Sequence, residues 1–398
     1  MAFYGRNYCK LMLIRKPLTT IVVKSNGSRC NLNCEYCFYL KKDLQYSDEQ
    51  LMDDSCLEIF IRQLMEQSGT SFGIVWQGGE PSLTGATFYR KVIAWMQHYG
   101  QGKNKLISNL LQTNGYSLSN EMLDLMSEYS FLCGLSLDGP EEIHDAYRKT
   151  STGKGSWNEV MKSWKKLQAR NIATNILCCV TSASANRAND IYHFYKQNAM
   201  HWLQFIPVSE FNLLGKSAEF SLSAKDWGQF MCDIFDSWHY DYITNNQPPS
   251  IRFVENAFYA HLGLNAPECT FSEECGNYLV LEHNGDVFSC DYLVGNDTLL
   301  GNIHQQNLID MLNSPQQISF GVAKKNHHEA CQNCRWLNYC YGGCPKYRDP
   351  LTQKYSFCES WKTFLNYSEK RFIPIVANYK KNISFSKIET LDISGFFQ

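Results

Sequence analysis

The sequence predicts an α/β fold, a partial (β/α)6 barrel of the TIM-like kind followed by a small cysteine-rich domain. Two observations carry this prediction. Short β-rich runs alternate with longer helical segments over residues 20–208, which is the pattern of a parallel sheet with crossover helices. From Cys269 to Cys358 the residue composition changes: eight cysteines lie among predicted turns that contain Gly, Asn and Asp.

Six β-rich runs are predicted to form the strands of the barrel. Each run ends in Gly, Asn, Ser, Asp or Pro, so a loop follows each strand, and helical segments at 53–67, 88–100 and 157–170 lie between them. In barrels of this kind, functional residues gather at the carboxyl ends of the strands. The predicted strands are 20–26, 72–79, 108–115, 133–139, 174–181 and 202–208.

The chain length of 398 residues allows one large domain and a smaller one. We expect the fold of the cysteine-rich domain to rely on bound metal more than on a hydrophobic core. The predicted segments are an N-terminal extension (1–18), the barrel (19–240), a bridge (241–268), the cysteine-rich domain (269–368) and a tail (369–398).

Composition excludes several classes of protein. With 44% hydrophobic residues the chain can bury a full core, and its net charge of −2 gives no support for binding to nucleic acid or an anionic membrane. No apolar run approaches the roughly 20 residues of a membrane helix, and no signal peptide is evident. Seventeen cysteines without an export signal indicate metal or cluster ligation in a reducing cytoplasm.

Three cysteines, Cys30, Cys34 and Cys37, form a C-x3-C-x2-C motif directly after the first predicted strand. A cubane [4Fe–4S] cluster is normally held by four cysteines, so three ligands on one loop leave one iron open to a substrate or cofactor. Structural zinc is the alternative. Zinc ribbons favour paired C-x2-C units, however, and no nearby cysteine or histidine offers a fourth ligand.

Two further motifs follow predicted strands. In GGEP, at 78–81, Gly78 and Gly79 let the backbone approach a ligand closely, and Glu80 offers a carboxylate to a ligand's ammonium group. A short helical segment separates SLDGP, at 136–140, from Arg148. Each motif also has a structural alternative, since the first can be a simple turn and the second a helix cap with an arginine in a surface ion pair.

The C-terminal cysteines supply enough ligands for two complete four-cysteine sites. Two structural zinc ions are the alternative to iron–sulfur clusters. The six other cysteines of the chain are expected to be small buried hydrophobic residues. The spacings are Cys269-x5-Cys275-x14-Cys290 and Cys331-x2-Cys334-x5-Cys340-x3-Cys344-x13-Cys358.

Together these motifs resemble those of the radical SAM superfamily with its SPASM extension and, from about residue 18 to 368, those of the anaerobic sulfatase-maturating enzymes. Such enzymes oxidise a cysteine or serine of a sulfatase to formylglycine. The resemblance is carried by CNLNCEYCFYL, WQGGEPSL, LLQTNG, GLSLDGPEEIHDAYR, NILCCVT, LQFIPV, EHNGDVFSCDYLV, LGNI and CQNCRWLNYCYGGCPKYR.

The resemblance implies three [4Fe–4S] clusters and S-adenosylmethionine as cofactors. The GGEP segment would meet the amino group of S-adenosylmethionine, and Ser136 and Arg148 its carboxylate. Asp291 matches the catalytic base of the family, and Tyr39 and Gln77 match positions of its substrate pocket. The implied auxiliary ligands are Cys269, Cys275, Cys290 and Cys344 for the first cluster, and Cys331, Cys334, Cys340 and Cys358 for the second.

The implied partners are a peptide or protein substrate and a low-potential electron donor such as flavodoxin or ferredoxin. A close alternative is a maturase of ribosomally made peptides, which would form a cyclophane or thioether cross-link on a precursor peptide. Residues 1–18 are too short for the leader-binding segment of many such maturases. A non-catalytic iron–sulfur or zinc protein is the remaining hypothesis, and it predicts no binding of S-adenosylmethionine.

Overall fold

The computed structural model describes residues 15–41, 51–210 and 217–382. The predicted extension 1–18 therefore lies mostly outside the described residues, as does the end of the predicted tail. A single ten-stranded sheet forms the centre of the molecule, with strand order β10-β9-β8-β1-β2-β3-β4-β5-β6-β7.

The six predicted strands form consecutive parallel neighbours in this sheet, which confirms the predicted parallel α/β fold. In β2, buried residues alternate with partly exposed ones, whereas in β1 the residues after Thr20 are all buried between two neighbouring strands. These strands are β1 (Thr20–Lys24), β2 (Ser71–Gln77), β3 (Leu106–Thr113), β4 (Leu132–Ser136), β5 (Thr174–Val180) and β6 (Trp202–Pro207).

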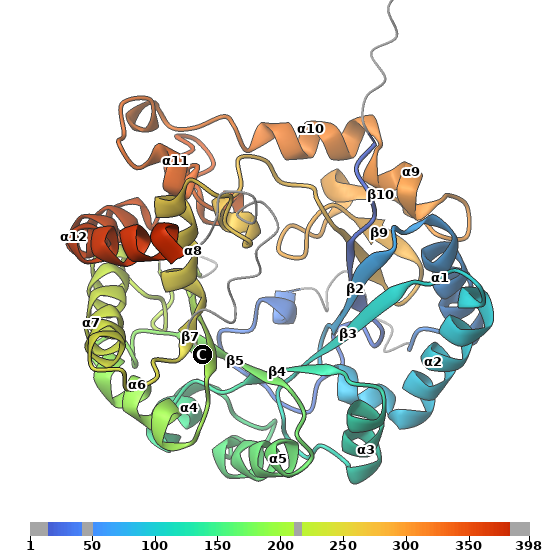
Figure 1. The fold of residues 1–398 in the computed structure, drawn as a ribbon. Coiled ribbons are helices and arrows are strands. Elements are labelled where there is room, and N and C mark those ends of the chain that lie inside the picture. Colours follow the sequence, from blue (N-terminus) through green and yellow to red (C-terminus); the bar gives the residue numbers. More distant parts are fainter. Residues whose placement is uncertain (1–14, 42–50, 211–216, 383–398) are drawn as a thin grey trace, which may run out of the picture.

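Crossover helices cover the outer side of the curved sheet (Figure 1). Side chains at their N-termini cap α1 and α3, where Asp53 accepts from the backbone N–H of Cys56 and Ser119 from that of Met122. The helices are α1 (Asp54–Gln67), α2 (Ala86–Gly100), α3 (Asn120–Glu128), α4 (Glu141–Tyr147), α5 (Trp157–Ala169), α6 (Ala188–Gln197), α7 (Ala224–Ile243) and α8 (Arg252–Leu262).

The cysteine-rich region extends the same sheet. Strand β8 (Leu279–Glu282) pairs in parallel with β1, and β9 (Asp286–Phe288) and β10 (Leu299–Asn302) follow as antiparallel strands. At the other edge, β7 (Ser250–Ile251) pairs with β6. The remaining helices are α9 (Leu308–Leu312), α10 (Pro315–Ala323), α11 (Leu337–Cys340) and α12 (Cys358–Asn382).

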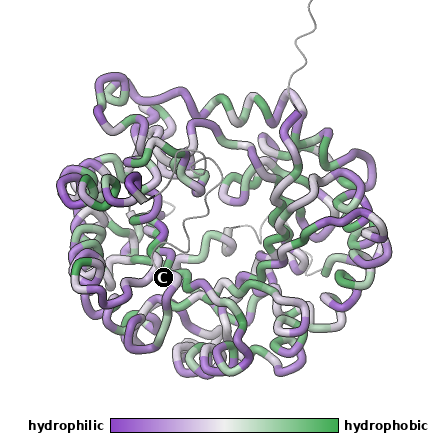
Figure 2. Tube along the Cα trace, in the orientation of Figure 1, coloured by the Kyte–Doolittle hydropathy of each residue, from purple (hydrophilic) through white to green (hydrophobic). Residues whose placement is uncertain are grey.

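The hydrophobic core is continuous from the barrel into the cysteine-rich region. It includes Leu281 and Phe357 together with barrel residues such as Trp76. Hydrophobic residues follow the strands and the helix sides that face them, while hydrophilic residues lie mostly at the periphery (Figure 2). The cysteine-rich region thus has more hydrophobic core than we expected from its sequence. The segment boundaries stay predictions, although the one at 368–369 falls inside α12.

No helix in the described ranges is long and apolar enough to cross a membrane.

Candidate active site and cysteine-lined cavities

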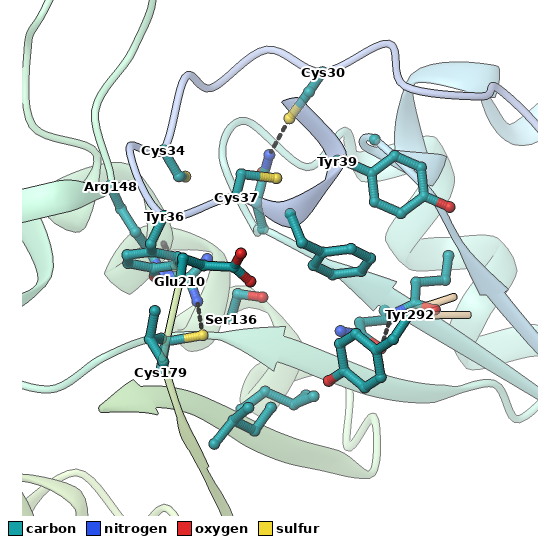
Figure 3. Close-up of a pocket in the computed structure, with 18 of the residues that line it drawn as sticks. Cys30, Cys34, Tyr36, Cys37, Tyr39, Ser136, Arg148, Cys179, Glu210 and Tyr292 are labelled. Carbon is teal, nitrogen blue, oxygen red and sulfur yellow. Dashed lines mark hydrogen bonds between the residues drawn. The ribbon is translucent and has the colours of Figure 1, made fainter. Parts of the chain in front are cut away.

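A cavity of about 170 Å³ lies at the carboxyl ends of β2 to β6, below the loop that follows β1. Figure 3 shows Cys30, Cys34 and Cys37 on this loop, with Tyr39 and Tyr292 on one side of the cavity and Tyr36, Arg148 and Cys179 on the other. The cavity is also lined by Gln77, Gly78, Gly79 and Ser136, for which the resemblance implied site roles, and by Asn114 of the LLQTNG segment.

The three cysteines of the loop all line the cavity. The backbone N–H of Leu32 and the side-chain amide of Asn114 donate to the sulfur of Cys30, over 3.4 and 3.5 Å. Burial raises the pKa of Cys30 to about 11 and that of Cys34 to about 12, so the bare thiols hold their protons. Iron ligation requires thiolates and would displace those protons. N–H donors to sulfur suit a ligated thiolate, so this loop fits an iron–sulfur cluster.

The GGEP segment packs against the backbone of the cysteine loop. The N–H of Gly79 donates to the carbonyl of Gly27 over 2.7 Å, and that of Glu80 to the carbonyl of Arg29 over 2.8 Å. A Cβ atom at Gly79 would lie 2.1 Å from the Arg29 carbonyl oxygen, so only glycine fits there. Gly79 therefore permits close approach to another backbone segment as well as to the cavity.

The carboxylate of Glu80 is buried and does not line the cavity. It accepts hydrogen bonds from the hydroxyl of Thr113, the N–H of Asn114 and the N–H of Ser82. Burial raises the pKa of Glu80. The side chain thus ties the end of β3 to the loop after β2, and the predicted contact of Glu80 with an ammonium group stays a prediction.

Asp138 connects three walls of the cavity, a role that its sequence motif did not indicate. Its carboxylate pairs with Arg148 through two hydrogen bonds, of 2.8 Å to Nε and 3.0 Å to Nη2. It also accepts from the hydroxyl of Tyr36 and from the N–H of Cys179. The helix α4 is capped by Pro140 without a side-chain bond, so Asp138 is not a helix cap. Arg148 is part of a buried pair at the cavity and not of a surface pair.

The predicted base Asp291 lies next to this cavity, but its side chain is not among the groups that line it. Its Oδ1 lies 2.5 Å from the Nζ of Lys24, and 12% of the Asp291 side chain is exposed. Lys24 is fully buried at the end of β1 and donates to the Gln77 side chain over 2.8 Å. Its ammonium also lies 4.8 Å from the centre of the Tyr39 ring.

Lys24 therefore joins the three residues that the resemblance assigned to the base and the substrate pocket, namely Asp291, Gln77 and Tyr39. Gln77 and Tyr39 both line the cavity. Lys24 belongs to none of the sequence motifs described above. The available signal was a single lysine at the end of the otherwise apolar run TIVVK, because a buried charge requires a partner.

The C-terminal cysteines gather around two separate cavities, in the same two groups that the resemblance implies. The first cavity, of about 40 Å³, is lined by Cys269, Cys275, Cys290 and Cys344. The second, of about 180 Å³, is lined by Cys331, Cys334, Cys340 and Cys358. Among the described residues, no three His, Cys, Asp or Glu side chains are grouped to hold a single metal ion.

The first of these cavities also fits a group with hydrogen-bond acceptors. The hydroxyl of Ser289 lines it, is buried, and has no hydrogen-bond partner within the described part of the chain. A buried hydroxyl normally finds a partner, and the sulfur atoms of a cluster are acceptors. The four thiols and this hydroxyl together suit an iron–sulfur cluster, whereas the ligand assignment stays a prediction.

Of the six remaining cysteines, Cys9 lies outside the described residues. Four are buried as expected, namely Cys56, Cys133, Cys178 and Cys232. Cys179 differs, because it lines the cavity and its sulfur lies 3.6 Å from the Nη2 of Arg148.

Comparison with protein families gives two matches. Residues 27–191 match the radical SAM superfamily, and residues 269–335 match an iron–sulfur cluster-binding domain known as SPASM. The first match covers the three-cysteine loop and β2 to β5, but it ends before β6. The second begins at Cys269 and includes five of the eight C-terminal cysteines.

Similar curated proteins align with nearly the whole chain. The serine-type anaerobic sulfatase-maturating enzyme of Bacteroides thetaiotaomicron is 33% identical over 95% of this chain and 93% of its own length. The cysteine-type enzyme of Clostridium perfringens is 32% identical over 92% of this chain and 100% of its own.

Solved structures agree with these matches. Native anSMEcpe with bound AdoMet and the Cp18Cys peptide superposes with a TM-score of 0.84 at 31% identity, covering 91% of this chain and all of the other. Streptococcus suis SuiB bound to S-adenosylmethionine shares the fold alone, with a TM-score of 0.60 at 14% identity over 87% of this chain and 77% of the other.

Proposed function

The chain belongs to the anaerobic sulfatase-maturating enzymes of the radical SAM superfamily, and we propose that it oxidises a cysteine or serine side chain of a sulfatase to formylglycine. A radical SAM enzyme with a SPASM domain carries a [4Fe–4S] cluster, S-adenosylmethionine and further iron–sulfur clusters as cofactors. The observation that carries the proposal is the meeting of the three-cysteine loop, the GGEP glycines and Ser136 with Arg148 at one cavity.

In this proposal, Cys30, Cys34 and Cys37 hold the first cluster, and Gly78, Gly79, Ser136 and Arg148 bind S-adenosylmethionine. When bound, these cofactors supply a 5′-deoxyadenosyl radical that removes a hydrogen atom from the β-carbon of the target residue. Arg148 suits a carboxylate ligand because a guanidinium can form two parallel hydrogen bonds with it. The paired Asp138 keeps that guanidinium in a fixed orientation.

We propose that Asp291 takes the thiol or hydroxyl proton of the target residue. A general base must come within hydrogen-bond distance of the proton it removes. The Asp291 side chain is 12% exposed and lies next to the cavity. In this proposal the substrate reaches it past Tyr39 and Gln77, which line the cavity. Lys24 contacts the Asp291 carboxylate and holds it in place, so Asp291 is oriented before the substrate binds.

The direct test is anaerobic incubation with S-adenosylmethionine, dithionite and a peptide that contains C-x-P-x-R or S-x-P-x-R, followed by mass spectrometry. Formylglycine formed from cysteine replaces sulfur by oxygen with loss of two hydrogens, and formylglycine formed from serine loses two hydrogens only. Loss of two hydrogens from the cysteine peptide with sulfur retained would instead indicate a cross-link and contradict the proposal.

Two variants separate the proposed roles. The triple substitution Cys30→Ala, Cys34→Ala and Cys37→Ala should abolish reductive cleavage of S-adenosylmethionine. Asp291→Asn should still form 5′-deoxyadenosine but yield at least tenfold less formylglycine for each molecule of it. Equal product in Asp291→Asn would remove this residue from the role of base.

The partners of the reaction follow from the same proposal. The substrate is a peptide or protein segment, and a low-potential carrier such as flavodoxin or ferredoxin supplies the electron that starts turnover. Replacing dithionite by reduced flavodoxin in the assay above tests the second part, with the electron donor omitted as control.

A further inference from the structure

Two cations, Lys324 and Arg348, are buried near the cysteines that line the two cavities of the cysteine-rich region. Their exposed fractions are 1% and 7%. Within the described residues no ion pair joins either side chain to a carboxylate. Glu268 lies within electrostatic range of Lys324 but accepts its hydrogen bond from Asn256. Burial of a charge is costly unless an opposite charge compensates it, so both cations call for a nearby anion.

Lys324 follows α10 and points at the loop that starts with Cys269. Its ammonium donates to the backbone carbonyls of Cys269 (2.8 Å), Thr270 (2.9 Å) and Ser272. This ammonium interacts electrostatically with the thiols of Cys275, Cys269 and Cys344. All three line the first cavity. Lys324 therefore places a positive charge against one wall of that cavity.

Arg348 lies between the two groups of cysteines. Its guanidinium donates to the carbonyls of residues 341, 342 and 343, which connect Cys340 of the second cavity to Cys344 of the first. It also donates to the carbonyls of Lys324 and Asn326. Its charge interacts electrostatically with cysteines of both cavities, namely Cys275 and Cys344 of the first and Cys331 and Cys340 of the second.

An iron–sulfur cluster held by four cysteines would supply the missing anion. Four thiolates carry more negative charge than the positive charge of the iron–sulfur core offsets, so the complete site is negative and becomes more negative on reduction. The net charge around a cluster, hydrogen bonds to its sulfur atoms and its exposure set its reduction potential. A buried cation within a few ångströms favours the reduced, more negative form.

We propose that Lys324 and Arg348 are the counter-charges of the two auxiliary clusters and raise their reduction potentials, Lys324 for the first cluster and Arg348 for both. This inference rests on the proposed function only in its assignment of clusters to the two cavities. In the reaction, a higher potential makes the auxiliary clusters better acceptors for the electron that leaves the substrate.

The test is a redox titration of anaerobically purified protein, followed by electron paramagnetic resonance. The background is the triple variant Cys30→Ala, Cys34→Ala and Cys37→Ala, so that only the auxiliary clusters contribute. Lys324→Met should lower one reduction potential by about 59 mV or more, which is tenfold in the one-electron equilibrium constant. Arg348→Gln should lower both potentials.

A matched control is Lys325→Met, since Lys325 is the next residue, has a side chain 39% exposed and pairs with Glu273 and Glu274. It should leave both potentials unchanged. Lys324→Arg keeps the charge and should keep the potential. If Lys324→Met and Lys325→Met give the same potentials at equal iron content, the proposal is wrong, and Lys324 only holds the loop of Cys269.

Measuring the iron content of each variant shows whether a substitution has prevented cluster assembly. Loss of about four irons in Lys324→Met with full loading of Lys324→Arg supports a counter-charge, whereas equal loss in both variants contradicts it. The measurement needs no peptide. A failed formylglycine assay therefore leaves this inference intact, and unchanged potentials leave the proposed oxidation intact.

Discussion

At the scale of single residues, the carboxylate of Asp138 connects three elements of the candidate site. Its carboxylate binds the end of α4 through Arg148, the cysteine loop through Tyr36, and β5 through the N–H of Cys179. Both members of the Asp138–Arg148 pair are buried. Removal of one partner of such a pair leaves the other charge uncompensated.

We therefore expect Asp138→Asn to lower the free energy of unfolding by about 3–5 kcal/mol. The measurement is anaerobic urea denaturation followed by circular dichroism. The matched control is Asp124→Asn, which removes the carboxylate of another aspartate–arginine pair, with Arg170, but one whose aspartate is 63% exposed. Its effect should stay below about 1 kcal/mol. Equal effects of the two substitutions would contradict the role assigned to Asp138.

His144, on α4, makes the barrel sensitive to acid. Its Nδ1 accepts from the N–H of Asp138, and its Nε2 lies 2.9 Å from the hydroxyl of Ser156. Burial lowers the pKa of His144 to about 3. Because the unfolded chain takes up this proton near pH 6.5, it binds more protons than the folded state between pH 6.5 and about 3. Folding stability is therefore lost as the pH falls through this window.

The expected slope from this residue is about 1.4 kcal/mol per pH unit below pH 6. His144→Asn keeps an acceptor for the Asp138 N–H but has no proton to take up, so its stability should fall less steeply between pH 6 and pH 5. Urea denaturation at both pH values measures the difference. Parallel pH dependence of the two proteins would show that His144 does not remain neutral in the folded state.

The sequence indicated candidate chemistry-bearing side chains but not the residues that contact them. The cysteine spacings, GGEP, Ser136 and Arg148 could be selected because each has a recognisable motif. Asp138 and Cys179 could not, because their roles depend on contacts across the barrel. Lys24 offered only the weak signal of a lysine at the end of an apolar run. Asp291 is an intermediate case, since resemblance selected it, while its pairing with Lys24 depends on the alignment of β1 with β8.

At the scale of elements, the turn after β2 sets the position of the cysteine loop. A Cβ atom at Gly79 would collide with the backbone of Arg29, which directly precedes Cys30. Gly79→Ala must therefore push the two loops apart. Overpacking of this kind costs about 1–3 kcal/mol. The displaced cysteines would no longer face the cavity together.

We expect Gly79→Ala to lose about four irons per chain and to lose cleavage of S-adenosylmethionine, while the auxiliary clusters remain. The matched control is Gly73→Ala in β2, because a Cβ atom there meets no atom within 4 Å. Iron analysis and visible absorbance of both variants measure the result. Full iron content and activity in Gly79→Ala would show that the loop tolerates displacement.

The elements themselves were largely predictable. All six predicted strands and three predicted helices form within a few residues of their expected bounds, because apolar runs and helical periodicity are local signals. Two features had no local signal. The pairing of β8 with β1 joins Val22 to Val280 across the whole barrel sequence. The second is α12, which starts at Cys358, continues into the predicted tail and packs on α7 and α8.

At the scale of the whole molecule, these two features make the barrel and the cysteine-rich region one structural unit. Strand β1, which leads into the three-cysteine loop, is held between β2 and β8. Val22, Val280 and Phe288 form a small buried cluster on one face of this junction. We therefore expect β1 and β8 to open together, although the sequence suggested two domains.

Native-state hydrogen exchange with mass spectrometry tests this coupling. Val280→Ala removes about 1.5 kcal/mol of burial, so amide exchange in peptides covering both 20–24 and 279–282 should rise by roughly tenfold at unchanged iron content. The matched control is Val180→Ala, an equally buried valine at the end of β5, which should raise exchange around β5 and β6 and leave 279–282 unchanged.

If Val280→Ala raised exchange in β8 alone, the two regions would be separate cooperative units. The cysteine loop would then be positioned by the barrel without help from the cysteine-rich region. A coupled response instead means that binding of the auxiliary clusters stabilises the strand that leads into the radical-generating site.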